Sequence, residues 1–353
     1  MRGLRKYLTP FAPDQSGAVS VLYELGGIIV ICDAGGCTGN VCGFDEPRWF
    51  QNKSAVFSAG LRDMDAILGR DDRLVAKLAD AADKVGASFA AIIGTPVPAV
   101  IGTDYLALKR MSEKKTDLPI MTVDANGMEL YDSGEEKAWL ALFQTFAKEI
   151  YPVDEGSVGI LGMTPQDISD LGAADRIREF FKDKYDQQAV CYGMGDGLEE
   201  VKKASSVSRN IVVSPAALKT AEYLKKTFGT VYEVGYPLVE ELIPDMDYAG
   251  KKVLVVHQQV IADSIRKELR KKGAAEIQTA SWFMMQKELR EEHDVFLRDE
   301  DDYTELIKNN DFDFIFADAA MERMTPQAAE RFINVRHFAV SGRLTETRYF
   351  YGR

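Results

Sequence analysis

The sequence predicts an α/β fold of three Rossmann-like subdomains, in which parallel sheets are flanked by helices. Short apolar runs rich in β-branched residues are followed by turn residues and helical patterns, at residues 28–31, 157–162 and 251–256. A length of 353 residues with 46% apolar content is sufficient for two or three domains with their own cores. The pattern breaks at residues 152–156 and 244–252. The subdomains are therefore predicted to span residues 1–151, 152–248 and 249–353.

The first subdomain is predicted to open with a helix over residues 16–25 that ends at Gly26-Gly27, followed by a buried strand over residues 28–31. A further strand is expected at residues 118–123. A helix should follow, because apolar side chains recur at i, i+3, i+4 and i+7, the spacing of one buried helix face. These side chains are Trp139, Leu142, Phe143 and Phe146.

The second and third subdomains continue this alternation. Strands are expected at residues 157–162, 189–192, 210–215, 251–256 and 311–318. The second of these contains Cys191, which we assign to the core because a free cysteine in an apolar strand usually behaves as a small hydrophobic residue.

Composition excludes several classes of protein. The formal net charge of −12 argues against a general nucleic-acid binder, which would carry a basic footprint. No run approaches the ~20 apolar residues of a membrane span, and the N-terminus lacks the apolar region of a signal peptide. We therefore expect a cytoplasmic protein. The four cysteines do not form a secretory disulfide framework, and a reducing compartment suits thiolate ligation.

Three of the four cysteines, Cys32, Cys37 and Cys42, are spaced C-x4-C-x4-C around the turn at residues 33–36. Ligands of open α/β sheets bind outside the carboxyl ends of strands, and a helix start there favours a thiolate. Thiolates are soft ligands for iron–sulfur clusters, zinc or copper(I). The alternative is that the cysteines are buried core residues, which applies best to Cys32 at the end of its strand.

The run LYELGGIIVICDAGGCTGN at residues 22–40 resembles the first signature block of the nitrogenase component 1 family, which includes the reductases of protochlorophyllide, chlorophyllide and nickel-tetrapyrrole biosynthesis. In that family a His-Gly-x-x-Gly-Cys turn supplies a cysteine to an iron–sulfur cluster between two subunits. Cys37 matches this cysteine and Gly36 the glycine before it. The His-Gly pair is replaced here by Asp33-Ala34.

Two further ligand positions of the family differ in this chain. A cysteine that the family carries 26 residues before the one matched by Cys37 corresponds to Phe11. Residues 63–104 resemble the second family block, in which the expected cysteine is Thr95, so a ligand position is either left open or replaced. Cys42 and Cys32 are the candidates to complete the set. Cys37 with one of them, from each of two subunits, would supply the four thiolates of a [4Fe–4S] cluster.

The resemblance implies a nitrogenase-like reductase that receives electrons from an ATP-dependent iron protein and acts as a dimer with itself or with a sister subunit. The substrate would be a small molecule or a tetrapyrrole, bound in the cleft between subdomains, where a second metal centre is also conceivable. His257 follows the strand whose counterpart in nitrogenase leads to the active-site cofactor. Because histidine titrates near neutral pH, we expect His257 to be a catalytic proton donor, or else a histidine hydrogen-bonded within its loop.

Two other functions remain open from the sequence. The chain could be a non-catalytic scaffold for metallocofactor assembly with the same fold. It could also be a small-ligand-binding α/β module of the periplasmic-binding-protein type, against which the cysteine group argues.

Overall fold

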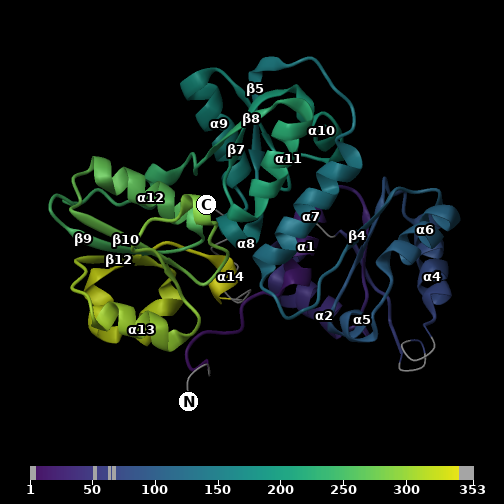
Figure 1. The fold of residues 1–353 in the computed structure, drawn as a ribbon, viewed down its shortest axis with the longest axis horizontal. Helices are drawn as coiled ribbons and strands as arrows, with labels where there is room; N and C mark the ends of the chain where they lie inside the picture. Colours follow the sequence, from purple (N-terminus) through teal and green to yellow (C-terminus); the bar gives the residue numbers. More distant parts are fainter. Residues whose placement is uncertain (1–4, 51–53, 63–64, 66–68, 342–353) are drawn as a thin grey trace.

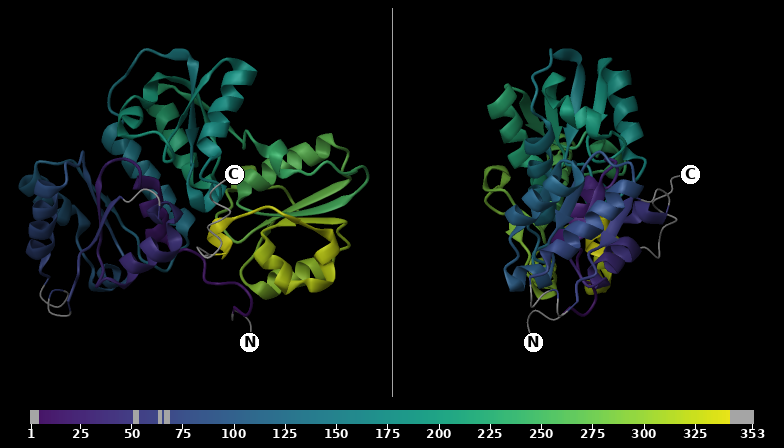
Figure 2. Two further views of the ribbon diagram at one scale, coloured as in Figure 1. Left: turned by 180° about the vertical axis from the view of Figure 1, so that it is seen from behind. Right: turned by 90° about the vertical axis from the view of Figure 1, so that its right-hand side faces the viewer.

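Three parallel sheets organise the chain, and each forms a lobe of the molecule (Figure 1). The computed structural model describes residues 5–50, 54–62, 65 and 69–341. The beginning of the second family block, at residues 63, 64 and 66–68, lies outside the described residues. The lobes surround a common centre, and the side view in Figure 2 shows that the molecule is thinner than it is wide.

The first sheet has the strand order β2-β1-β3-β4, and all its strand pairs are parallel. The strand predicted at residues 28–31 is β1, whose four side chains are all buried. The elements are β1 (Ile28–Ile31), β2 (Ala55–Ser58), β3 (Ala90–Ile93), β4 (Ile120–Val123), α1 (Asp14–Leu22), α2 (Gly36–Asn40), α4 (Asp71–Lys84), α5 (Pro96–Ile101), α6 (Tyr105–Thr116), α7 (Tyr131–Phe146), the π-helix η1 (Val41–Asp45) and the 3-10 helix η2 (Pro47–Phe50).

The second sheet has the order β6-β5-β7-β8 and is also parallel. Cys191 is buried in its edge strand β6, as predicted. The elements are β5 (Asp154–Leu161), β6 (Gln188–Cys191), β7 (Val207–Val212), β8 (Val231–Val234), α8 (Pro165–Ile168), α9 (Ala173–Tyr185), α10 (Leu198–Lys202), α11 (Leu218–Phe228), and the 3-10 helices η3 (Ala204–Ser206), η4 (Pro215–Ala217) and η5 (Val239–Leu242).

The third sheet has the order β11-β10-β9-β12-β13, again parallel. The doubly wound, helix-flanked sheets confirm the predicted α/β class. The elements are β9 (Lys252–Val256), β10 (Glu276–Ser281), β11 (Val295–Phe296), β12 (Phe314–Ala317), β13 (Phe332–Asn334), α12 (Gln259–Lys271), α13 (Glu300–Lys308), α14 (Phe338–Ser341), and the 3-10 helices η6 (Lys287–Leu289), η7 (Ala319–Met324) and η8 (Pro326–Arg331).

The long helix α7 joins the lobes through its buried face. Trp139, Leu142 and Phe143 are fully buried, and they share one apolar core with residues of the first and second sheets. Two glycines allow α7 to cross α1 closely: a Cβ on Gly17 would lie 1.9 Å from the Tyr131 carbonyl oxygen, and one on Gly134 would lie 1.7 Å from that of Asp14. This crossing fixes where the start of α7 meets the other lobes.

The segment before α1 reaches the third sheet instead of its own. The backbone N–H of Leu8 donates to the Glu300 carboxylate at 2.8 Å, and the Phe11 ring packs edge-on against Trp282 with centroids 5.7 Å apart. Phe11, the residue expected from the resemblance to replace a family cysteine, is therefore a core residue between lobes.

Candidate functional site

The cysteine segment, residues 32–45, lies at the carboxyl end of β1. The chain leaves the strand at Cys32, turns at Gly35, whose φ of 116° falls in the left-handed region that favours glycine, and enters α2 at Gly36. The helix widens directly into the π-helix η1, which contains Cys42. Its i+5 hydrogen bond joins the Glu46 N–H to the Val41 carbonyl at 2.9 Å. π-turns of this kind occur often at functional sites.

Asp33 holds the start of α2 through its carboxylate. Its carboxylate accepts the backbone N–H of Thr38 at 2.7 Å and the hydroxyl of Ser58, from β2, at 2.6 Å. The side chain is 2% exposed. Asp33 is thus a capping residue whose oxygens are already engaged by the protein.

The three cysteines of the segment differ in exposure and acidity. Cys32 is 1% exposed, and burial raises the pKa of its thiol to about 12. Cys37 and Cys42 are partly exposed. Burial, followed by the charge of Asp33, raises the pKa of Cys37, and burial with Glu46 raises the pKa of Cys42 to about 11. Without a bound cation these thiols are protonated at neutral pH, which differs from the expectation that the helix start would produce a thiolate.

One chain offers two accessible thiols in this segment, half of the four that a four-thiolate cluster requires. Within the described residues, no group of three or more His, Cys, Asp or Glu side chains is placed to hold a metal. Thr95 is fully buried and donates its hydroxyl to the Cys32 carbonyl at 2.6 Å, so it holds the turn in place. The two accessible thiols, Cys37 and Cys42, have the chemistry of iron–sulfur ligands and fit such a cluster only if a second subunit completes it.

Behind the segment, a buried ion-pair network ties it to the second subdomain. Asp45 accepts hydrogen bonds from Ser16 at 2.6 Å and Asn40 at 2.7 Å. Arg48 pairs with Glu46 and donates to the Gly193 carbonyl of the second subdomain at 2.9 Å. The position of Cys42 is therefore set by contacts to two subdomains.

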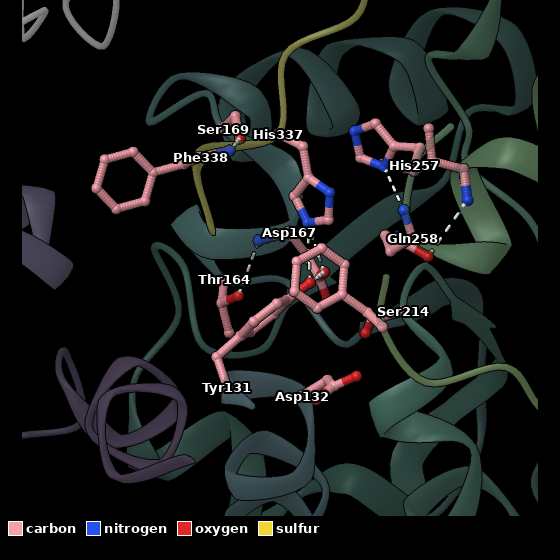
Figure 3. A network of polar contacts seen from close by, with 12 residues as sticks. Tyr131, Asp132, Thr164, Asp167, Ser169, Ser214, His257, Gln258, His337 and Phe338 are labelled. Carbon is pink, nitrogen blue, oxygen red and sulfur yellow. Dashed lines mark hydrogen bonds and ion pairs between the residues drawn. The ribbon is translucent and has the colours of Figure 1, made fainter. Parts of the chain in front are cut away.

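His257 lies at the carboxyl end of β9 and faces the junction of the three lobes (Figure 3). It is 2% exposed; its Nδ1 accepts the Gln258 backbone N–H at 2.8 Å, and its Nε2 lies 3.0 Å from the Arg336 carbonyl. Burial, and then the neighbouring His337, lower the pKa of His257 well below its usual value. The imidazole is neutral, and the backbone of its own subdomain engages both nitrogens.

A second histidine, His337, stacks on the first with ring centroids 4.3 Å apart and planes at 10°. Its Nε2 lies 2.9 Å from the hydroxyl of Tyr131, which donates to Asp167 at 2.5 Å. Figure 3 shows these side chains converging from α7, α8 and the segment before α14. The junction is thus lined by titratable groups from all three subdomains.

Residues 15–239 match the sequence profile of the nitrogenase component 1 type oxidoreductases. The chain belongs to this family.

Solved structures agree with the assignment at the level of the fold. "Nitrogenase Cp1 at pH 6.5" superposes with a TM-score of 0.73 at 12% identity, covering 99% of this chain and 93% of that one. "Nitrogenase Cp1 at pH 5" gives a TM-score of 0.69 at 15% identity, with coverage of 99% and 90%. No curated protein matches the sequence. None of the helices in the described part of the chain has the length and apolar character needed to cross a membrane.

The titratable residues at the junction are not among the site residues predicted from the sequence. They are Tyr131, Glu135, Asp167 and His337. One signal was present: Glu135 lies four residues after Tyr131 and four before Trp139, so a carboxylate stands in the apolar stripe of α7. A charged residue on the buried face of a helix is uncommon unless it is paired, which makes it a candidate functional residue in this family member.

Proposed function

We propose that this chain is the catalytic component of a nitrogenase-like reductase. It would receive electrons from an ATP-dependent iron protein through a [4Fe–4S] cluster shared with a second subunit. The observation that carries the proposal is the pair of partly exposed thiols, Cys37 and Cys42, on one irregular helical segment at the carboxyl edge of the first sheet. When bound, the cluster supplies one-electron transfer.

Two thiols in each chain account for the four thiolates that such a cluster takes when two subunits meet. Cys32 is too buried to take part, and Thr95 is engaged by the Cys32 carbonyl. Asp33 and Asp45 accept hydrogen bonds within the segment and so fix its conformation. Cys37 and Cys42 are therefore the proposed ligands, with Gly36 beside them.

The surface around the cysteine segment is suited to a second subunit. A Cβ added at Gly35, Gly36, Gly39 or Gly43 would meet no described residue within 4 Å, so no described side chain covers the backbone beside the thiols. Helix α5 begins next to the segment, because Thr95 at its N-terminus bonds to Cys32. Large apolar side chains are exposed on η1, on α5 and on the loop before α7: Phe44, Val97, Val100, Ile101 and Met128.

The substrate site would lie at the junction of the three subdomains. His257 and His337 are stacked there, and a small molecule or a tetrapyrrole, or a second metal centre, would be accommodated between the lobes. Both imidazoles are buried, so substrate entry requires the lobes to separate.

The first test is the iron content. Protein purified anaerobically should contain about two irons and two acid-labile sulfides per subunit, the amount for one [4Fe–4S] cluster per dimer, with an EPR signal after dithionite reduction. Cys37→Ser and Cys42→Ser should each lose the cluster and weaken the dimer. Cys191→Ser is the matched control and should keep both, because Cys191 is buried in β6, in a different sheet. Full iron content in the Cys37→Ser protein would refute the ligand assignment.

A second measurement separates a reductase from a scaffold for cofactor assembly. Mixed with ATP and the ATP-dependent iron protein of a nitrogenase-like system, a reductase component should reoxidise the reduced iron protein when a substrate is present. A scaffold would bind the cluster without this reaction, and the catalytic proposal would then be wrong.

A further inference from the structure

Glu135 of α7 and Asp167 of α8 form a buried acid pair. Glu135 is 0% exposed and Asp167 is 1% exposed, and Thr164 joins them: its hydroxyl donates to Glu135 Oε1 at 2.6 Å and accepts the backbone N–H of Asp167 at 3.4 Å. Tyr131 donates to Asp167 Oδ1 at 2.5 Å. The remaining oxygens, Oε2 of Glu135 and Oδ2 of Asp167, have no hydrogen-bond partner in the described structure.

Two ionised carboxylates cannot share such a site. Like charges close together in a dry interior strongly raise one pKa, and a proton on one carboxyl would let that group donate to the other. Burial, with the charge of Asp167 second, places the pKa of Glu135 well above its ordinary value. A single shared proton would satisfy the two oxygens that lack donors.

The groups facing the acid pair do not offer a cation that would stabilise two negative charges. Asp132 lies on α7 one turn before Glu135, Tyr131 precedes it, and His337 Nε2 is 3.7 Å from Asp167 with His257 stacked behind. Among the described residues, neither member of the pair forms an ion pair with a lysine or an arginine. The surroundings thus favour one proton on the pair at neutral pH.

A hydrogen-bonded chain leads from the acid pair to His337. Since the Tyr131 hydroxyl donates to Asp167, it must accept from His337 Nε2–H, at 2.9 Å. The other ring nitrogen, Nδ1, is buried without a hydrogen-bond partner in the described structure. The chain therefore begins at two carboxyls and ends at a free imidazole nitrogen next to His257, as Figure 3 shows for Tyr131, Asp167 and the two histidines.

We propose that Glu135 and Asp167 share one proton and exchange protons with His337 through Tyr131, so that the acid pair is the proton store of the junction between the three subdomains. When the pair takes up a second proton, Nδ1 of His337 accepts one from a hydronium that reaches it as the lobes separate, while its Nε2 proton moves to Tyr131 and the Tyr131 proton moves to the pair. Release reverses these moves. In each move one N–H or O–H bond breaks as another forms, and no electrons are transferred.

The use of this proton store rests on the proposed reductase function, because reductions consume protons together with electrons. Its existence depends on α7, α8 and the His337 segment alone. The store can be tested in protein that contains no cluster, so its failure and the failure of the reductase proposal are distinguishable.

Infrared spectroscopy tests the shared proton. At about pH 8 ordinary carboxyls are ionised, as are Asp45 and Asp132, each of which has a pKa raised to about 6. The wild-type protein should still show the C=O stretch of a protonated carboxyl, and Glu135→Gln should lose it. Glu129→Gln, at an exposed carboxylate paired with Lys137, is the control and should keep it. Asp167→Asn replaces Glu135→Gln if that variant does not fold. A band that is absent from the wild type, or that persists in the variant, would overturn the proposal.

Nitrogen-15 NMR tests the connection to His337, because the sequence has only three histidines and each signal can be assigned by substitution. His337 should be the Nε2–H tautomer in the wild type. Both Glu135→Gln and Tyr131→Phe should change the nitrogen-15 chemical shift of its Nε2, because each removes a member of the hydrogen-bonded chain that ends at this atom. Tyr192→Phe removes a buried hydroxyl that has no hydrogen-bond partner among the described residues, and should not change it. An unchanged His337 in both test variants would show a structural acid pair with no relay.

Discussion

Arg48 and Glu46 form a buried two-point ion pair directly behind the cysteine segment. Nε of Arg48 lies 2.8 Å from Glu46 Oε1, and Nη2 lies 2.8 Å from Oε2. The side chains are 4% and 1% exposed. Since the same guanidinium donates to the Gly193 carbonyl, the pair connects the proposed cluster ligands to the second subdomain.

Replacing Arg48 by methionine should therefore be costly. The substitution leaves Glu46 as an uncompensated buried charge, which typically costs about 3–5 kcal/mol of unfolding free energy. Arg70→Met removes an exposed pair with Asp72 and should cost less than about 1 kcal/mol. Urea unfolding of the two variants is the measurement. Equal stability of both would show that the Arg48 pair contributes no more than a surface pair.

The crossing of α1 and α7 depends on glycine at two positions. An alanine Cβ at Gly17 or Gly134 would collide with backbone carbonyl oxygens, which cannot move as a flexible side chain does. We expect Gly17→Ala and Gly134→Ala each to lower the unfolding free energy by about 1–3 kcal/mol, the usual cost of overpacking. Gly86→Ala, where a Cβ would meet no described residue within 4 Å, should be close to neutral. Thermal unfolding would contradict this account if all three variants melted alike.

Alkylation should distinguish the four cysteines in metal-free native protein. Cys37 and Cys42 are partly exposed, whereas Cys32 and Cys191 are buried. Iodoacetamide should therefore modify only the first two, as read by mass spectrometry of peptides. Because the pKa values of both accessible thiols are raised, the rate should increase as pH rises above neutral. Modification of Cys32 at the rate of Cys37 would contradict the buried position of the strand end.

The fold was predictable because its signal is local. The apolar run at residues 28–31 is β1, and the i, i+3, i+4, i+7 pattern around Trp139 is α7. Short runs of hydrophobic residues that are buried on both faces carry this information without reference to the rest of the chain. The turn before Cys37 was predictable for the same reason, because its residues, Asp33 to Gly36, are adjacent in the sequence.

The site was less predictable because its contacts join residues distant in the sequence. Nothing near Thr95 in the sequence shows that its hydroxyl is bound to the Cys32 carbonyl, which leaves Thr95 as a structural residue. The hydrogen bond of Tyr131 to His337 spans 206 positions. The π-helix that carries Cys42 also has no distinctive sequence pattern. Such features depend on how the lobes pack, which single-sequence periodicity does not encode.

The carboxyl of Asp45 should give the protein a pH-dependent stability that an asparagine removes. Burial raises the pKa of Asp45 to about 6, above its usual value near 4. The folded state therefore binds more protons than the unfolded state between about pH 4 and pH 6, and this contribution to stability is lost as pH rises through about 6. Since one pKa unit corresponds to about 1.4 kcal/mol, ionised Asp45 should cost the folded state about 3 kcal/mol.

In Asp45→Asn the amide oxygen can still accept hydrogen bonds from Ser16 and Asn40, but the side chain cannot ionise. The stability of this variant relative to the wild type should therefore rise by about 3 kcal/mol between pH 4 and pH 8, in urea unfolding at a series of pH values. Asp72→Asn should show the opposite sign and only below about pH 4, because Arg70 lowers the pKa of that exposed carboxylate. If the unfolding free energy of Asp45→Asn followed that of the wild type at every pH, the Asp45 carboxylate would have to be hydrated in solution. The cysteine segment would then be less firmly packed against α1 than the structure shows.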